Sequence, residues 1–261
     1  MNEINPIAII QARMGSTRLP GKVLKPLVGK PALWHLINRL KESQYLNDIV
    51  VATTINNEDD AIVEFCDKNN VKCFRGSAED VLDRYYQSAK LFKANPISRI
   101  TADCPALDPF ILDEVFKLYF ERKYDICGLG GEFPDGLDCG CCSFRVIEDA
   151  WNNTDLPSDR EHVGTTYLNN NPKGFKKGVL EKFKGMSHHR WTLDEESDYL
   201  FLQEVFARLY KPGKIFQAQD ILDLLDREPD LMKINANIIR DEGYIKSLEE
   251  DKEYLKLKVK N

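Results

Sequence analysis

The stretch PIAIIQARMGSTRLPGK, residues 6–22, decides the fold, because it joins a short apolar run to a loop of glycine, hydroxyl and basic residues. The β-branched run over residues 6–12 predicts a buried strand. The loop that follows, up to Lys30, contains basic but no acidic residues before its end. Backbone N–H groups, hydroxyls and cations in a loop after a strand are suited to phosphate oxygens. We therefore expect an anion-binding loop at the end of the first strand.

Two common phosphate-binding motifs do not fit this loop. Gly15 and Gly21 are one residue too far apart for G-x-x-x-x-G-K-[ST], and Val23 stands where that motif needs a metal-binding hydroxyl. The dinucleotide fingerprint G-x-G-x-x-G is also missing from the sequence. A surface loop with solvated charges is the alternative interpretation, but Arg13, Arg18 and Lys22 would then repel one another without an anion.

Strand and helix patterns alternate through the first half of the chain. Apolar runs predict further strands at residues 48–53, 71–74 and 96–102, and helical spacing predicts helices at residues 31–40, 58–69, 77–92 and 108–120. This alternation predicts an α/β fold with a mostly parallel sheet and helices on both faces. Ligands bind such sheets at the carboxyl ends of the strands, so the polar loops at 13–30, 53–57 and 103–105 should converge.

The second half is less regular. Residues 125–144 are rich in Gly and Cys with strand-like pieces, and helices are predicted at residues 158–169, 195–210 and 219–226. We expect one domain over residues 1–240 with a β-containing insertion at about 125–180. Residues 241–261 have mixed charge and helical composition, which predicts a solvated C-terminal tail.

Composition limits the function classes. The chain has 36 Lys and Arg against 42 Asp and Glu, a net charge of −6, which argues against a nucleic-acid groove. Positive charge is concentrated in residues 1–30, which hold five basic residues and one acidic residue. The apolar runs are far shorter than a membrane span, and the first residues lack a secretory pattern, so no membrane partner and a cytoplasmic location are expected.

The seven cysteines are expected to be reduced and mostly buried, because their number is odd and most lie in apolar contexts. The cluster Cys139-Gly140-Cys141-Cys142 lacks the C-x-x-C spacing of a zinc site. In a strand, Cys141 and Cys142 would point to opposite faces of the sheet.

Motifs throughout the chain resemble those of a known family. AIIQARMGSTRLPGK at residues 8–22 is similar to the signature loop of cytidylyltransferases that make CMP-activated acidic sugars, and above all to the spore-coat polysaccharide biosynthesis type, related to the CMP-Kdo and CMP-acylneuraminate synthetases. The further matching motifs are VATT (51–54), DVLDRYY (80–86), RITADCP (99–105), FPDGLD (133–138), REHV (160–163) and HHRWTLD (188–194). They follow in the expected order over residues 6 to about 235. The resemblance implies a Rossmann-like nucleotidyltransferase fold and a homodimer whose interface lies in the insertion.

The resemblance also implies how the loop works. In the family, the loop cradles the triphosphate of CTP while an acceptor oxygen attacks the α-phosphorus and pyrophosphate leaves. The nucleotide-binding residues carried over are Ala12, Arg13, Gly15, Ser16, Arg18, Lys22, Thr53, Asp83 and Arg84. Arg13, Lys22 and Asp103 are the expected catalytic residues.

The family holds Mg²⁺ on two aspartates, which correspond to Asp103 and Asp194. Oxygen ligands together with phosphates suit this ion. The alternative for Asp103 is a turn former, and the alternative for Asp194 is a cap of the helix predicted at 195–210, in which Thr192 and Glu195 fit a capping box.

The acceptor is expected to be small and anionic, bound by Asp135, Asp138, His188 and Arg190. Where the family usually has a Glu in the run after FPDGLD, this chain has Gly140, which would tolerate a more anionic acceptor. His188 and His189 are candidates for a general base, although a hydrogen-bonded structural role is the commoner use of such residues. Two alternatives stay open: a nucleotidyltransferase using another NTP or a phosphorylated or phosphonate acceptor, and a non-catalytic nucleotide-binding protein.

Overall fold

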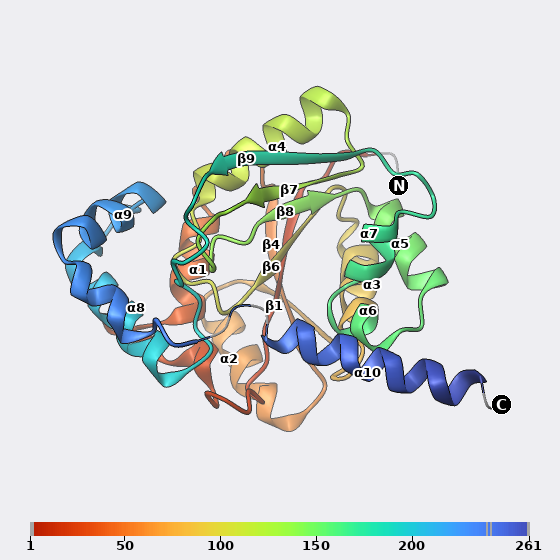
Figure 1. The fold of residues 1–261 in the computed structure, drawn as a ribbon, viewed down its shortest axis with the longest axis horizontal. Helices are drawn as coiled ribbons and strands as arrows, with labels where there is room; N and C mark the ends of the chain where they lie inside the picture. Colours follow the sequence, from red (N-terminus) through yellow and green to blue (C-terminus); the bar gives the residue numbers. More distant parts are fainter. Residues whose placement is uncertain (1–2, 239, 241, 260–261) are drawn as a thin grey trace.

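One seven-stranded sheet organises the chain in the computed structural model, which describes residues 3–238, 240 and 242–259 (Figure 1). The strand order is β5-β4-β1-β6-β8-β7-β9. β8 is antiparallel to both neighbours, and all other neighbours are parallel. The bounds are β1 Ile7–Gln11, β4 Asp48–Thr54, β5 Lys72–Gly76, β6 Ile97–Thr101, β7 Ile126–Gly131, β8 Gly140–Cys142 and β9 Lys177–Phe183. β2 (Pro26–Leu27) and β3 (Lys30–Pro31) form a separate small ribbon.

Helices cover both faces of the sheet, as predicted. One face packs against α1 (Ala32–Leu40), α2 (Asp60–Lys68), α4 (Pro109–Arg122), α8 (Glu196–Leu209) and α9 (Ala218–Arg227). The other face packs against α3 (Val81–Phe92) and α5 (Phe144–Asn153), with residues around α7 (Thr165–Asn170) beside them. Short helices complete the order: η1 Lys22–Leu24, η2 Asn57–Asp59, α6 Pro157–Glu161 and η3 Pro229–Ile234.

The first half follows the predicted alternation closely. The apolar strands are buried in the middle of the sheet, with Ala8, Ile9 and Ile10 of β1 inaccessible to solvent. Side chains that the sequence places before two helices cap them: Asp80 accepts the N–H of Asp83 at 2.8 Å, and Asp108 accepts that of Phe110 at 2.9 Å. The α/β prediction is therefore confirmed.

The second half differs from the predictions in three ways. The strand-like pieces over 125–144 are β7 and β8, which extend the same sheet, and β9 adds an edge strand that was not predicted. Helix α5 was also not predicted. The single helix expected over residues 158–169 is two helices, because Val163 and Gly164 both have positive φ (56° and 74°) and interrupt the helical path.

The C-terminal helix α10 (Glu242–Val259) is helical as predicted, but the expectation of a solvated tail is wrong for one of its faces. Ser247 and Asp251 are buried against α6. The Asp251 carboxylate accepts the N–H of Ser158 at 2.9 Å and its hydroxyl at 2.5 Å, and so caps the start of α6. Helix α10 then extends along the side of the molecule, with its far end away from the sheet (Figure 1).

Six of the seven cysteines are buried, and Cys73 is half-buried. Cys141 and Cys142 lie in the cores on opposite faces of the sheet, as their adjacent positions in β8 predict. Among the helices that the structure describes, none has both the length and the apolar character that crossing a membrane requires.

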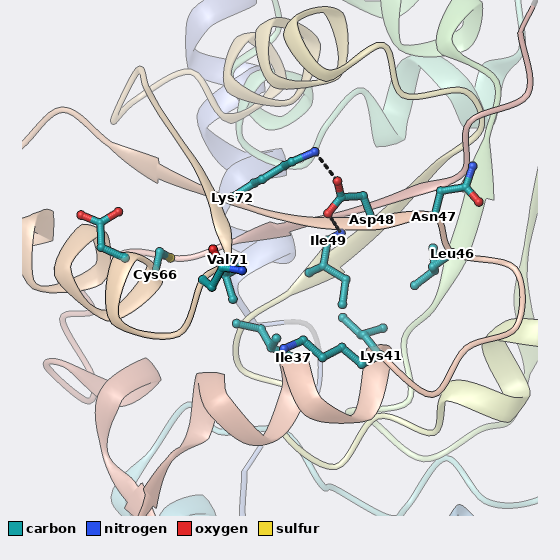
Figure 2. A pocket seen from close by; sticks show the side chains of 12 residues that line it. Ile37, Lys41, Leu46, Asn47, Asp48, Ile49, Cys66, Val71 and Lys72 are labelled. Atoms are coloured by element: carbon teal, nitrogen blue, oxygen red, sulfur yellow. Dashed lines mark hydrogen bonds and ion pairs between the residues drawn. The ribbon is translucent and has the colours of Figure 1, made fainter.

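The parallel strands β1, β4, β5 and β6 all end at one edge, which we call the carboxyl edge. A hollow of about 580 Å³ lies at the opposite edge, where β4 and β5 begin, between α1 and α2 (Figure 2). Figure 2 shows an ion pair between Lys72 and Asp48 in its lining. None of the residues predicted to act on a ligand contributes to this hollow.

Candidate active site

The loop after β1 is anchored by a buried carboxylate that the sequence analysis missed. Asp59 is inaccessible to solvent; it accepts the N–H of Met14 at 2.6 Å and the hydroxyl of Thr54 at the end of β4. Leu19 and Val23 insert into the core from the same loop. An acidic residue close behind the second strand was the available signal, because loops that follow neighbouring parallel strands meet at the carboxyl edge. The loop backbone is thus fixed by the protein itself.

Lys22 joins the two aspartates that were predicted to bind metal. Its Nζ lies 2.9 Å from Asp103 Oδ2 and 2.5 Å from Asp194 Oδ1. These three residues come from the loop after β1, the turn after β6 and the segment before α8. The side chains are 14%, 25% and 18% exposed, in the order Lys22, Asp103 and Asp194. The fold therefore brings residues 81 and 172 positions apart into one charged cluster.

The electrostatics of the cluster favour full ionisation. Burial opposes the charge of Lys22, but the carboxylates of Asp103 and Asp194 outweigh it and raise the pKa of the ammonium group. Burial likewise opposes the charge of Asp103, yet Lys22 and the Thr101 hydroxyl bring the pKa of that carboxyl down to about 2. At neutral pH the cluster holds one cation between two anions.

Both arginines of the loop are exposed, and Arg18 borders this cluster. Arg18 forms ion pairs with Asp194 at 3.3 Å and Glu195 at 3.5 Å. Arg13 is exposed and makes no hydrogen bond or ion pair within the described part of the chain. Ser16 accepts the N–H of Leu19 at 3.3 Å. The loop thus presents cations to solvent beside the two aspartates, as predicted for an anion site.

Arg190 fixes the position of Asp194 from behind. Its guanidinium donates to both carboxylate oxygens of the buried Asp198 at 2.9 Å, to Asp135 at 2.8 Å and to Asp194 at 3.4 Å. These four bonds use most of the five N–H donors of the guanidinium, so Arg190 is committed mainly to the carboxylates of the protein. Asn235 donates to the Arg190 carbonyl and to Asp198, which completes the support.

The helix-cap alternative for Asp194 is wrong. Helix α8 begins at Glu196 with Glu195 as its N-cap, and the capping box pairs Glu195 with Asp198 rather than Thr192 with Glu195. Asp194 precedes the cap, and its carboxylate faces Lys22. Asp103 does lie in a turn, where its carbonyl accepts the Leu193 N–H at 2.8 Å, but the turn leaves its carboxylate to Lys22.

Asp135 and Asp138 form an acidic pair beside the cluster. Burial and the nearby charge of Asp138 raise the pKa of Asp135 to about 7, although Arg190 acts in the opposite sense. Arg240, from the segment after α9, approaches the same pair and donates to the Phe133 carbonyl at 2.8 Å. The sequence analysis missed Arg240, because only the fold brings it there from beyond η3.

The predicted nucleotide side is only partly assembled. Thr53 is buried at the end of β4, and its hydroxyl has no partner among the described residues. Arg84 lies beside Gly76 and donates to the Ser77 carbonyl at 2.6 Å, and burial lowers its pKa, with Arg13 adding to the effect. Asp83 is separated from Arg84: its carboxylate accepts the Trp151 indole N–H at 2.8 Å, in the contact between α3 and α5.

The histidines lie outside the charged cluster. His188 is exposed, and its Nδ1 lies 3.0 Å from the Gly185 carbonyl. His189 is buried; burial, with a smaller effect of His188, lowers its pKa to about 4. Neither ring contacts Lys22, Asp103 or Asp194 in the described hydrogen bonds.

Gly136 lies in the acidic segment between Asp135 and Asp138 and packs against the backbone next to Arg190. We predict that this position does not tolerate a side chain. Its φ is +103°, and a Cβ atom there would lie 2.6–2.8 Å from backbone atoms of Trp191 and Thr192. We expect Gly136→Ala to lower the free energy of unfolding by about 2–4 kcal/mol, because backbone strain and overpacking add. Urea unfolding measures the change.

Gly213→Ala is the matched control. Gly213 also has positive φ (+74°), but a Cβ there would meet nothing within 4 Å. This variant should lose only about 1 kcal/mol, from backbone strain alone. Equal losses for the two variants would show that the contact with Trp191 does not matter.

Comparisons with known proteins agree on one family. A family model described as cytidylyltransferase matches residues 7–228. Spore coat polysaccharide biosynthesis protein SpsF of Bacillus subtilis is 33% identical over 245 residues, covering 88% of this chain and 97% of that protein. The 3-deoxy-manno-octulosonate cytidylyltransferase of Bartonella bacilliformis is 30% identical over 246 residues, covering 90% of each. The structure of a cytidylyltransferase from Leptospira borgpetersenii superposes with a TM-score of 0.84 at 32% identity, covering 91% of this chain and 100% of that one.

Proposed function

The chain belongs to the cytidylyltransferase family, and on that premise we propose that its site moves CMP from CTP to a small anionic acceptor such as an acidic sugar. As a member of this family, it is a CTP-dependent cytidylyltransferase. The assignment of individual residues to the reaction is our proposal. The observation that carries it is the cluster in which Lys22 bridges Asp103 and Asp194, directly beside the cationic loop.

The donor set fits Mg²⁺. Two carboxylates that face a common point, with phosphate oxygens supplied by the substrate, form the kind of site that this ion occupies in phosphoryl-transfer enzymes. We propose that phosphate oxygens of the nucleotide and water complete the coordination, as is usual for Mg²⁺ held by one or two carboxylates. In the structure, the positive charge between the two carboxylates is the ammonium group of Lys22. We propose that Asp103 and Asp194 hold Mg²⁺ when CTP binds.

The residues of the chain then divide the work. The loop from Ala12 to Lys22 holds the triphosphate through backbone N–H groups and the side chains of Arg13, Ser16 and Arg18. An acceptor oxygen attacks the α-phosphorus, and the bond to the bridging oxygen of pyrophosphate breaks. Lys22 and the two arginines stabilise the negative charge of the leaving pyrophosphate. Bound Mg²⁺ would supply charge neutralisation at the α-phosphate.

The kind of acceptor is proposed from the charges of the residues beside the cluster and from the acceptor that a relative's name gives. The Bartonella relative is a 3-deoxy-manno-octulosonate cytidylyltransferase, an enzyme of an acidic sugar. In this chain, Asp135 and Asp138 lie beside the cluster and suit sugar hydroxyls, whereas anionic groups need a cation. The roles predicted for His188 and Arg190 in acceptor binding stay predictions, because His188 is exposed away from the cluster and Arg190 is occupied.

Pyrophosphate release tests the proposal. Each of the four NTPs is incubated with Mg²⁺ and with 3-deoxy-manno-octulosonate, a sugar phosphate, a phosphonate or a neutral sugar. We expect release with CTP and an acidic sugar, and at least tenfold less with the other NTPs. Release that requires a phosphorylated or phosphonate acceptor would replace the acidic sugar in the proposal. Binding of CTP without release from any acceptor would favour a non-catalytic nucleotide-binding role.

A homodimer through residues of about 125–180 is part of the proposal, and sedimentation equilibrium tests it. This segment contains the edge strand β9 and helix α7, which lie on one side of the molecule (Figure 1). The cytoplasmic location and the division into a domain of residues 1–240 and a tail stay predictions.

A further inference from the structure

Arg99 is a half-buried cation without a partner on the sheet. It lies in β6 two residues after Ile97, which belongs to the core on the α3 side, so Arg99 faces the same side. Its Nε is buried without a hydrogen-bond partner, and the side chain makes no ion pair within the described part of the chain. A buried guanidinium nitrogen that lacks a partner is costly, which indicates that something else satisfies it.

The protein groups that face Arg99 are neutral. Tyr85 on α3 and Cys142 on β8 lie close enough to feel its charge: burial raises the pKa of each to about 12, and Arg99 acts against that rise. Both are therefore protonated at neutral pH. No carboxylate in the described residues is paired with Arg99.

A second unsatisfied group lies beside it. Gln11 ends β1, and its Oε1 is also buried without a partner. In the register of β1 and β6, Ile9 pairs with Arg99 and Gln11 with Thr101, so Gln11 and Arg99 are diagonal neighbours on one face. From the spacing of strands and residues, their Cα atoms are about 8 Å apart. A donor, Arg99 Nε, and an acceptor, Gln11 Oε1, are thus both without hydrogen-bond partners on neighbouring strands.

Glycines leave the sheet bare on the other side of Arg99. The register of β6 and β8 pairs Ile97 with Cys142 and Ser98 with Cys141; continued by one residue, it sets Gly140 opposite Arg99. Gly128 of β7 pairs with Gly140. A Cβ atom on Gly128 would meet only the Cys139 carbonyl, at 3.7 Å, and one on Gly140 would meet only backbone. The atoms nearest to both Cβ positions are thus backbone atoms and not helix side chains, and we call these two residues the glycine face.

We propose, on the basis of the function proposed above, that Arg99 binds the carboxylate or phosphate of the acceptor, with Gln11 accepting a hydrogen bond from an acceptor hydroxyl and the glycine face giving the molecule room. The place is continuous with the reaction site, because Gln11 immediately precedes the loop and Asp103 follows the strand of Arg99. Asp103 lies two residues after the end of β6 at Thr101, so Arg99 is within a few residues of the charged cluster. A guanidinium fork matches both anions.

Binding measured without turnover tests the assignment. A CTP analogue with a methylene bridge between the α- and β-phosphorus is held at saturation with Mg²⁺. Calorimetry then measures the affinity for 3-deoxy-manno-octulosonate, for glucose 6-phosphate and for glucose. We expect one of the two anionic probes to bind and glucose not to bind. Arg99→Met should weaken the anionic probe at least tenfold, Arg99→Lys should weaken it less, and the Kd of the CTP analogue should stay within twofold.

Two further pairs of variants separate charge from structure. Gly128→Glu puts a carboxylate on the glycine face and should weaken the anion at least tenfold, whereas Gly128→Gln, of nearly the same size, should weaken it less. Arg145→Met removes an exposed arginine that pairs with Asp125 and should change nothing.

The outcomes are distinguishable from those for the proposed function. Loss of CTP binding, or no pyrophosphate release from CTP, would contradict the proposed function. The assignment of Arg99 is overturned if wild-type protein with bound CTP analogue binds neither anionic probe. It is equally overturned if Arg99→Met binds the anion as tightly as wild type does.

Discussion

Replacing Lys22 by methionine should lower kcat/KM for CTP by about 10³-fold. Methionine keeps most of the length of the side chain but removes the cation that we propose stabilises the leaving pyrophosphate, and preorganised charges of this kind are worth several kcal/mol in a transition state. Arg18, the neighbouring cation, pairs with Asp194 and Glu195 and does not contact Asp103 in the described ion pairs, so we expect it to replace Lys22 poorly. Steady-state pyrophosphate release measures the loss.

The same variant should be less stable, in a pH-dependent way. In wild-type protein the pKa of Asp103 is about 2, below its ordinary 3.8, so the pair with Lys22 stabilises the fold above about pH 4 and this contribution is lost as the pH falls toward 2. The difference in free energy of unfolding between wild type and Lys22→Met should therefore be full at pH 7 and shrink as the pH falls from about 4 to about 2. Urea unfolding at each pH measures it.

Mg²⁺ provides a further check on Lys22. Without the ammonium group, Asp103 loses its ion-pair partner, while Asp194 keeps its pairs with Arg18 and Arg190, and a divalent cation can take the place of Lys22. Mg²⁺ alone should raise the Tm of Lys22→Met more than that of wild type. Lys25→Met is the matched control, since Lys25 belongs to the same loop but contacts only Glu196, at 3.6 Å, and the Tyr199 ring. A similar loss of activity in both variants would contradict a specific role for Lys22.

Asp103→Asn and Asp194→Asn should each reduce kcat by about 10³-fold. Asparagine keeps the shape but removes the negative charge that a hard divalent cation requires, and the metal contribution is several kcal/mol. Each variant should also need a higher Mg²⁺ concentration for half-maximal rate. Pyrophosphate release titrated with Mg²⁺ at saturating CTP measures both effects.

A matched control is available for these aspartates. Asp60→Asn changes a carboxylate near the carboxyl edge that pairs only with Arg75, and its rate and Mg²⁺ requirement should match wild type. If Asp194→Asn kept the wild-type rate and Mg²⁺ requirement, Asp194 would serve only to order the chain before α8. The same result for Asp103 would reduce it to the turn former considered from the sequence.

The elements that could be predicted are those whose burial is visible as a pattern of apolar residues in the sequence. Strands β1 and β4 are buried on both faces, so most of their residues are apolar. The edge strand β9, with the sequence KGVLEKF, borders one strand only and carries Lys and Glu on its exposed positions, as edge strands do to avoid pairing with other chains. Its pattern therefore does not stand out from that of a loop. Helix α5 was not predicted because it begins directly after the Cys-rich strand β8, without a loop pattern between them.

The candidate site also has residues that the sequence predicts and residues that it does not. Lys22 and Asp103 were predicted to meet because loops after parallel strands end at one edge, whereas Asp194 was predicted from the family resemblance. Asn235 and Arg240 could not be predicted, because each supports the site through a contact that exists only after distant elements have packed. Arg99 lies in the interior of a strand. Whether it has a hydrogen-bond partner depends on the order and register of the strands, which the sequence does not give.

Helix α10 gives the chain a practical handle. It is attached to α6 and α7 through Asp251, Ser247 and Tyr244, which pair with Ser158, His162 and Thr166. Its far end points away from the carboxyl edge (Figure 1). An affinity tag, a fluorophore or a tether to a solid support placed there would keep clear of incoming CTP, so the enzyme can be immobilised by its C-terminal end with its reacting face toward the solvent.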